Sequence, residues 1–397
     1  MVQQFRPICV LNVSFKFFTK IVANRLTTVA NRIIRPSQSA FLPRRYILEG
    51  VVILHETIHE IRRKKQSGLI LKLDFENVYW SFLQQALRMN GFMSQWCKWI
   101  ESIVSGGNVG IKINDEMGNF FQTKKGLRQG DPLSPVLFNL VADMLAVFIS
   151  RAAIAGQFKG LVPHLVDGGL SILQYADDTI LFLENDLEQA KNLKLVLCAF
   201  EKLSGLKMNF HKSELFCMGE AKELVKTYTY LFGCQEGSFP FKYLGIPMSD
   251  HRLANKDWSM IEEHFQKKLS SWKGKLLSIG GRLVLINSVL SSLPMFMLSF
   301  FKIPKGVLKK LDYYRSRFFW QCDDHQKKYR LAKWSILSTP KCVGGLGITN
   351  LEFQNICLLS KWLFKLLNEE GMWQTLLKWK YLGNKVLSQV AKKPEDS

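Results

Sequence analysis

Two adjacent carboxylates interrupt an apolar stretch near the middle of the chain. The apolar run 170–174 precedes Tyr175-Ala176-Asp177-Asp178, and a second apolar run, 179–183, follows it. This pattern predicts a β-hairpin with the acidic pair at its turn. Because charges this close repel each other, a half-buried pair is stable mainly when a cation neutralises it, and carboxylate oxygens suit Mg²⁺. The alternative is a plain hairpin turn, in which Asp is common.

Another apolar run upstream also ends in a carboxylate. Residues 70–73 read as a buried strand, and Asp74 follows directly. If the two strands share a sheet, Asp74 comes beside Asp177 and Asp178, and this oxygen cluster is what a two-metal site needs. One ion would activate an attacking 3′-hydroxyl and the other would stabilise the leaving pyrophosphate. We therefore expect Asp74, Asp177 and Asp178 to be both catalytic residues and metal ligands.

A glycine-rich loop and a long apolar run lie between the acidic segments. The glycines of Gly126–Pro135 allow close backbone approach, and its prolines suit the start of a helix. The run that follows predicts a buried helix over 134–149. Further helices are predicted over 51–65, 80–90 and 187–203, the last with Gly205 as its C-cap, and a hairpin is predicted over 109–122.

In this order, Asp74, the Gly126–Pro135 loop and Tyr175–Asp178 resemble motifs A, B and C of a reverse transcriptase. The flanking segments resemble the non-LTR (LINE-type) retrotransposon enzymes, of the kind abundant in plants. These segments are Phe5-Arg6-Pro7-Ile8, Asn12-Val13-Ser14, Ala23-Asn24-Arg25-Leu26 and Gln38-Ser39-Ala40-Phe41 in the fingers, Ser204–Asn209 with Lys212-Ser213 as motif D, and Tyr243-Leu244-Gly245-Ile246-Pro247 as the primer grip. The resemblance covers nearly the whole chain.

The resemblance implies an α+β right-hand polymerase fold with fingers, palm and thumb. We expect partial fingers at 1–69, a palm with a small antiparallel sheet at 70–250, a helical thumb at 251–320, and a truncated helical C-terminal extension at 321–397. The net charge of +21 divides into +14 for residues 251–397 and +7 for residues 1–250. Basic residues among aromatics favour a thumb that holds a template–primer duplex, and the alternative is a solvated basic face.

The resemblance also implies an activity and a set of roles. The activity is RNA-directed DNA polymerisation with two Mg²⁺ ions, or Mn²⁺ as the alternative, and the partners are RNA template, DNA primer, RNA–DNA duplex and dNTPs. The implied contacts are Tyr175 beside the primer end, and Gln129 and Gly130 along the nucleotide and template, with Arg128 supporting that nucleotide-binding loop. The others are Lys212 (or Lys207) near the pyrophosphate, Arg45 (or Arg44) at the triphosphate, and Tyr243, Leu244 and Gly245 in the primer grip.

Two departures from the family pattern stand out. After Glu76 the family usually continues with Lys-Ala-Tyr-Asp, which this chain lacks before Asn77. The missing stretch includes the aromatic that gates the sugar 2′ position, and shortening it can displace Asp74 by more than the roughly 0.5 Å that such sites tolerate. Arg44 also replaces a turn glycine. The alternatives to an active enzyme are a decayed remnant that still binds nucleic acid and a maturase-like RNA-folding factor.

The remaining expectations concern metals and location. Cys322, His325 and Cys342 belong either to a zinc site or to core and loop, and His55 and His59 are expected on a helix surface. We find no signal peptide, and we take 290–301 as the longest apolar stretch, which is too short to span a bilayer. We expect an intracellular protein of the nucleus or cytoplasm, without membrane contact and without an endonuclease domain in this chain.

Overall fold

The structure is a computed structural model of the 397-residue chain. It describes residues 9–76, 78–209, 212–272, 277–320, 329–383 and 385–390. The chain forms two compact units: the first runs to Leu244 and resumes at Gly371, and the second is Gly245–Glu370. The second unit is therefore inserted into the first. The four predicted parts are divided at other points, and their boundaries stay a prediction.

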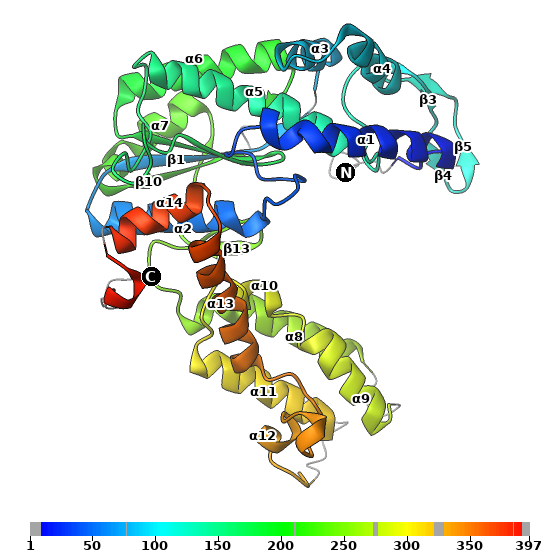
Figure 1. The fold of residues 1–397 in the computed structure, drawn as a ribbon, viewed down its shortest axis with the longest axis vertical. Helices are drawn as coiled ribbons and strands as arrows, with labels where there is room; N and C mark the ends of the chain where they lie inside the picture. The colour runs from blue at the N-terminus through cyan, green and yellow to red at the C-terminus, as the bar shows by residue number, and fades with distance from the viewer. Residues whose placement is uncertain are drawn as a thin grey trace. The chain divides into compact units, whose positions relative to one another are not determined.

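The first unit combines helices with a central sheet (Figure 1). Its helices are α1 (Val13–Ile33), α2 (Ile47–Arg63), α3 (Trp80–Met89), α4 (Ser94–Ser105), α5 (Ser134–Ile154), α6 (Leu187–Ser204), α7 (Val225–Phe232) and α14 (Met372–Leu377), with the 3₁₀ helices η2 (Gly219–Leu224) and η8 (Leu387–Gln389) and the π-helix η7 (Lys378–Leu382). The predicted helices near 51, 80, 134 and 187 are confirmed. Gly205 caps α6 with φ 70°, as expected.

Among the described residues, five strands form the main sheet. They are β1 (Gly68–Leu73), β7 (Ile172–Tyr175), β8 (Asp178–Glu184), β10 (Glu214–Met218) and β11 (Gln235–Glu236), in the order β11-β10-β1-β8-β7. All neighbours are antiparallel except β10 and β11, which are parallel. Figure 1 shows α5 and α6 over one face and α2 with α14 over the other. Because both faces are covered, β1 is a nearly continuous apolar run.

Short paired strands complete the first unit. They are β2 (Phe75–Glu76) with β9 (Lys207–Met208), β3 (Asn108–Val109) with β6 (Phe121–Gln122), and β4 (Lys112–Ile113) with β5 (Glu116–Met117). The last two pairs form the hairpin predicted over 109–122. The strand β12 (Phe241–Tyr243) ends the first part of this unit, and β13 (Ile246–Met248) begins the second unit.

Helix α5 is the most apolar long helix in the described part of the chain. By length and composition it could cross a membrane, but 61% of its most apolar window is buried inside the fold. The expectation that 290–301 is the longest apolar stretch is therefore wrong. Helix α5 packs against α3 and α6, and its buried residues belong to the main apolar core.

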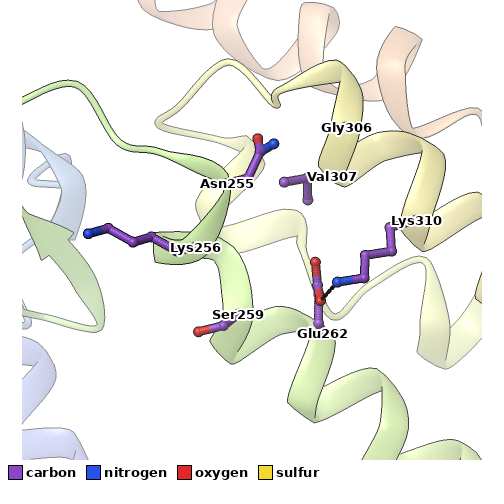
Figure 2. A pocket seen from close by; sticks show the side chains of 7 residues that line it. All are labelled: Asn255, Lys256, Ser259, Glu262, Gly306, Val307 and Lys310. Carbon is purple, nitrogen blue, oxygen red and sulfur yellow. Dashed lines mark hydrogen bonds and ion pairs between the residues drawn. The ribbon is translucent and has the colours of Figure 1, made fainter.

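Apart from β13, the regular elements in the described residues of the second unit are helices. Its elements are η3 (Asn255–Trp258), α8 (Ser259–Ser271), α9 (Ile279–Leu285), the π-helix η5 (Ile286–Leu290), α10 (Met295–Leu298), α11 (Lys305–Trp320), α12 (Trp334–Leu337), η6 (Lys341–Val343) and α13 (Leu351–Asn368). A pocket of about 290 Å³ lies where η3 and α8 meet the start of α11, and an ion pair between Glu262 and Lys310 crosses it (Figure 2).

The histidines of α2 and the predicted cysteine and histidine metal candidates differ in how the structure describes them. His55 and His59 are half-buried on α2, and Nδ1 of His59 lies 3.0 Å from Nζ of Lys380, so the predicted surface position is wrong. Helix α2 packs against both the sheet and α14, which leaves it little exposed surface. Cys322 and His325 lie outside the described residues, and Cys342 is exposed.

Candidate functional site

The acidic pair sits at a tight hairpin turn, as predicted. Tyr175 at the end of β7 pairs with Asp178 at the start of β8, which leaves Ala176 and Asp177 as the two turn residues. Ala176 has φ 54°, and positive φ at the first turn residue matches a type II′ hairpin, where glycine is usual. An alanine at this position is strained, so the surrounding structure must hold the turn.

The register of the sheet brings Asp74 to the same end as this turn. Strand β1 runs antiparallel to β8 with Leu73 opposite Thr179. Asp74 follows Leu73, and Asp178 precedes Thr179, so both residues lie where β1 and β8 meet the same end of the sheet. The three predicted acidic residues therefore share one end of the sheet, and each is half-buried.

The side chain of Asp74 faces a lysine. Nζ of Lys212 lies 3.5 Å from Oδ2 of Asp74, and the two side chains are 61% and 22% exposed. The loop that carries Lys212 is tied down at Asn209, whose N–H donates to the carbonyl of Asp74 at 3.0 Å. Strand β9 also pairs with β2, directly after Asp74. The structure thus places the predicted motif D lysine beside the motif A carboxylate.

The carboxylates do not form a metal site as they lie. Within the described residues, no three His, Cys, Asp or Glu side chains are grouped so that they could hold a metal ion. Three carboxylates are the right donors for Mg²⁺ in type, but an ammonium occupies the space next to Asp74. The residues present therefore do not fit the predicted two-ion site in this arrangement.

The glycine-rich loop is anchored by Arg128. Its guanidinium donates to the carbonyls of Ile103 (2.8 Å) and Gly106, at the C-terminal end of α4. These carbonyls have no partner within the helix, so a cation there is favourable. The carbonyl of Gln129 accepts the N–H of Cys9, and Gly130 has φ 98°. The structure gives Arg128 a supporting role; nucleotide and template contacts by Gln129 and Gly130 stay predictions.

Hydrogen bonds to two different parts of the first unit fix the segment after the predicted motif A. Asn77, next to the predicted four-residue loss, lies outside the described residues. Just beyond it, the carbonyl of Val78 accepts the N–H of Gly126, and Nε1 of Trp80 donates to the carbonyl of Gly126 at 2.7 Å. Tyr79 donates its N–H to Ser204. This short connection therefore joins the glycine-rich loop to the end of α6.

The loop between α1 and α2 lies against the acidic turn. Oε1 of Gln38 accepts the N–H of Ala176 at 3.0 Å, and the ring of Phe41 lies 6.1 Å from that of Tyr175. Arg45 donates to backbone carbonyls of this same loop, including Arg35 (2.6 Å) and Gln38 (2.5 Å). Its guanidinium thus holds the loop, a role other than the predicted triphosphate contact. Arg44 adopts φ 62°, a left-handed conformation that glycine adopts with less strain.

Tyr243 of the predicted primer grip is buried. Its side chain is 1% exposed, and its hydroxyl has no hydrogen-bond partner among the described residues. Burial raises the pKa of Tyr243, and the nearby Asp178 and Tyr175 add to the rise. Leu244 (φ 49°) and Gly245 (φ 83°) have the left-handed conformations of a tight turn. Tyr243 thus lies buried near the acidic turn, and primer contacts by Tyr243, Leu244 and Gly245 stay predictions.

Reasoning from the sequence missed two supporting residues. The sequence pattern places Gln38 in a motif without indicating a role, and it places Asp143 of α5 only within an apolar helix. Asp143 is 1% exposed and accepts the N–H of Arg35 at 3.0 Å. Burial raises its pKa to about 6, against the pull of Arg35 and Arg45. A carboxylate inside an otherwise apolar helix was the available signal.

Comparison with known proteins agrees with the geometry. The family "Reverse transcriptase (RNA-dependent DNA polymerase)" matches residues 2–248. The transposon TX1 149 kDa protein of Xenopus laevis is 28% identical over 301 residues, which cover 74% of this chain and 22% of that protein. The Pol polyprotein of retrotransposable element R2DM from Drosophila melanogaster is 25% identical over 373 residues, covering 88% of this chain and 33% of that protein. The chain spans a third or less of these relatives.

A solved structure of telomerase from Candida tropicalis, in complex with a TWJ fragment of telomeric RNA, aligns with 92% of this chain and 56% of that one, with 12% identity and a TM-score of 0.39. The sheet, its helices and the family match confirm the predicted α+β right-hand polymerase fold. The TX1 and R2 relatives confirm the predicted retrotransposon type. The chain belongs to the reverse transcriptase (RNA-dependent DNA polymerase) family, in its non-LTR retrotransposon branch.

Proposed function

We propose that this chain synthesises DNA on an RNA template from a primer 3′-hydroxyl. The observation that carries the proposal is the register of β1 against β8, which sets Asp74 at the same sheet end as Asp177 and Asp178. Family membership supplies the reaction class. Because the chain matches a third or less of its relatives' length, the activity of the whole protein is part of the proposal.

Residues around the turn have groups suited to this reaction. Tyr175 is half-buried beside Phe41 and presents an aromatic ring at the turn, where the primer end would pack. The ammonium of Lys212, beside Asp74, would offset negative charge on the leaving pyrophosphate. The backbone of Gln129 and Gly130 would lie along the incoming nucleotide.

Reverse transcriptases generally use divalent metal ions. We propose two Mg²⁺ ions, with Mn²⁺ as the alternative, and Asp74, Asp177 and Asp178 as the oxygen donors. Ion binding requires these carboxylates to group more tightly than they do in this structure, with Lys212 displaced from Asp74. A measured affinity of the protein for Mn²⁺, compared with that of Asp177→Ala, tests this donor set without any need for activity.

The proposed partners are RNA template, DNA primer, their duplex and dNTPs. Residues 245–370 hold 20 Lys and Arg against 10 Asp and Glu, a positive excess that suits a phosphate backbone. We assign duplex binding to this second unit. A nuclear or cytoplasmic location agrees with these partners and belongs to the same proposal.

Primer extension on an RNA template tests the function directly. With DNA primer, dNTPs and Mg²⁺, the protein is expected to extend the primer, and Asp177→Ala is expected to lose extension while it keeps affinity for the duplex. Equal extension by the protein and by Asp177→Ala would assign the activity to a contaminant and overturn the proposal.

A second function is favoured by the pair between Asp74 and Lys212 and by the ungrouped carboxylates. A remnant that binds nucleic acid without polymerising it would have this arrangement. Tight duplex binding without extension, at any Mg²⁺ or Mn²⁺ concentration, would favour this reading. Restoring Lys-Ala-Tyr-Asp after Glu76 would then be the next variant to assay.

A further inference from the structure

Gln38 makes a hydrogen bond to the most strained part of the acidic turn. Oε1 of Gln38 accepts the N–H of Ala176 at 3.0 Å and that of Ala40 at 3.1 Å. Ala176 is the residue with φ 54°, and Asp177 follows it directly. One side-chain oxygen therefore joins the loop between α1 and α2 to the residue that sets the direction of the two carboxylates.

The backbone around Gln38 also covers the edge of the sheet. Strand β7 is an edge strand of the five described, and Gln38 forms a parallel bridge with Gln174. The N–H of Gln174 donates to Ser37 at 2.8 Å, and the N–H of Ser39 donates to Gln174 at 3.0 Å. The loop is thus attached to β7 by its backbone, and the side chain of Gln38 makes the additional contact with the turn.

The orientation of the Gln38 amide follows from its partners. Both neighbours are backbone N–H donors, so the oxygen and not the nitrogen must face them. The Gln38 side chain is fully buried, and its Nε2 has no hydrogen-bond partner among the described residues. A buried donor without a partner is unfavourable. The two hydrogen bonds that Oε1 accepts act against this cost.

Side chains outside the turn fix the backbone of the loop between α1 and α2. Arg45 donates to the carbonyls of Gln38 (2.5 Å) and Arg35 (2.6 Å), and Asp143 accepts the N–H of Arg35 at 3.0 Å. Gln38 is therefore anchored through its main chain while its side chain contacts the turn. This is the arrangement of a residue that orients a site without touching the substrate.

We propose that Gln38 is a positioning residue that holds Ala176 in its left-handed conformation and so aims Asp177 and Asp178. This inference rests on the proposed function, because it assigns those carboxylates to the reaction. Without the acceptor oxygen, the turn would relax toward a conformation that alanine prefers, and the carboxylates would move away from their reacting geometry. A displacement of about 1 Å at such a site can cost on the order of 10²-fold in rate.

The test compares Gln38→Met, which keeps the size but removes the acceptor, with Gln84→Met as the matched control. Gln84 is also a buried glutamine, 6% exposed, but its Nε2 donates a hydrogen bond to the carbonyl of Cys97 on α4. Gln38→Met is expected to lower kcat in primer extension about 10- to 100-fold with little change in KM for dNTP. It is also expected to speed hydrogen exchange of the Ala176 amide at least about tenfold, because that amide loses its acceptor. Gln84→Met should change neither quantity.

Second variants keep the test decisive if Gln38→Met folds poorly. Ala176→Gly removes the strain at the turn, so the double variant Gln38→Met/Ala176→Gly should recover at least about fivefold in kcat over the single variant. Gln38→Glu keeps an acceptor oxygen and should protect the Ala176 amide. Unchanged exchange in Gln38→Met, or a double variant no better than the single one, would overturn the assignment.

Hydrogen exchange also separates this inference from the proposed function. If the parent protein does not extend a primer, the proposed function fails. The exchange of the Ala176 amide still reports whether Gln38 holds the turn. Slow exchange in the parent and fast exchange in Gln38→Met would support the role of Gln38 in that case too, and equal exchange would contradict it.

Discussion

Asp143 shows how one buried carboxyl adjusts the support of the site. Its folded pKa of about 6 lies above the unfolded value of about 3.9. A raised carboxyl pKa means that its contribution to stability is complete below about pH 4 and is lost as the pH rises through 6. Burial of the ionised carboxylate should therefore lower the stability of the fold above pH 6, although the contacts of Asp143 with Arg35 and Arg45 favour the ionised form.

We expect Asp143→Asn to stabilise the protein at pH 7.5 by about 1–2 kcal/mol and to leave its stability at pH 4 unchanged. Asparagine keeps an oxygen for the N–H of Arg35 and has no charge to bury. Thermal unfolding at the two pH values measures the effect. Asp186 provides the contrast, because hydrogen bonds from Gln189 and Glu188 lower its pKa. Asp186→Ala should therefore lower the unfolding temperature more at pH 7.5 than at pH 3. An Asp143→Asn protein that is less stable at pH 7.5 would contradict the assignment.

Single residues also show which parts of the site can be predicted from the sequence and which cannot. Asp74, Asp177 and Lys212 could be found because their positions along the chain follow a pattern, and the structure does bring them to one place. Their partners could not be found, because contacts between distant residues leave no local pattern. Arg45 illustrates this: its sequence position suggested a phosphate contact, and only the folded loop reveals the carbonyls that occupy its donors.

At the scale of elements, the end of α6 depends on a close contact. Gly205 has φ 70°, and a Cβ there would lie 2.4 Å from the ring of Tyr79. The same left-handed cap ends α7 at Gly233, with φ 71°, but nothing lies within 4 Å of a Cβ there. The two glycines therefore share the backbone requirement and differ only in their surroundings.

We expect Gly233→Ala to lower the free energy of unfolding by about 1–2 kcal/mol, because alanine is strained in the left-handed conformation. Gly205→Ala should cost about 2–4 kcal/mol, because it adds the clash with Tyr79 to the same backbone strain. Chemical denaturation of both variants gives the difference. Equal destabilisation would mean that Tyr79 moves aside freely and that the connection from Asp74 to α3 is loosely held.

Helix α2 carries two buried carboxylates, and Lys380 of η7 pairs with one of them, Glu56. The side chain of Lys380 is 1% exposed, and its Nζ lies 2.7 Å from Oε2 of Glu56, to which Tyr381 also donates. Burial acts to raise the pKa of Glu56, but His55 and Lys380 outweigh it, and the pKa is far below its usual value. Glu60 behaves likewise through Arg63 and His164, with a pKa of about 2.

We expect Lys380→Met to destabilise the protein by about 3–5 kcal/mol at neutral pH, because it leaves Glu56 buried without its ammonium partner. Depressed carboxyl pKa values stabilise above about pH 4.5, and that contribution is lost as the pH falls toward 2. The difference between Lys380→Met and the parent should therefore shrink on acidification. Lys385→Met, at an exposed lysine, is the control. A constant difference across pH would point to packing alone.

The elements themselves were largely predictable. Helices α3, α5 and α6 follow from apolar periodicity and end signals such as Gly205. The parallel edge strand β11 was not predicted, because two residues carry too little pattern. The half-buried positions of His55 and His59 were also missed, since a helix whose polar residues form buried ion pairs looks like a surface helix in sequence.

At the scale of the whole molecule, the second unit carries more positive charge per residue than the first: +10 of the net +21 lies in residues 245–370. Replacing residues 245–370 by a short linker should preserve the first unit, provided residues 371–390 are retained. Affinity of the full chain for an RNA–DNA duplex should fall by on the order of 10³-fold between 50 and 200 mM salt. The linker variant should bind weakly and with a smaller salt slope, measured by fluorescence anisotropy. Undiminished binding by the linker variant would place the duplex site in the first unit.

The return of the chain to its first unit has a consequence for synthesis. A ribosome completes β1, β7, β8 and β10 well before it makes Lys380, so the newly made first unit exists for a time with Glu56 of α2 lacking its ammonium partner. A stop codon anywhere between 245 and 379 would leave that state permanent. Late nonsense mutations should therefore yield protein that cellular proteases remove, although every predicted catalytic residue has already been translated.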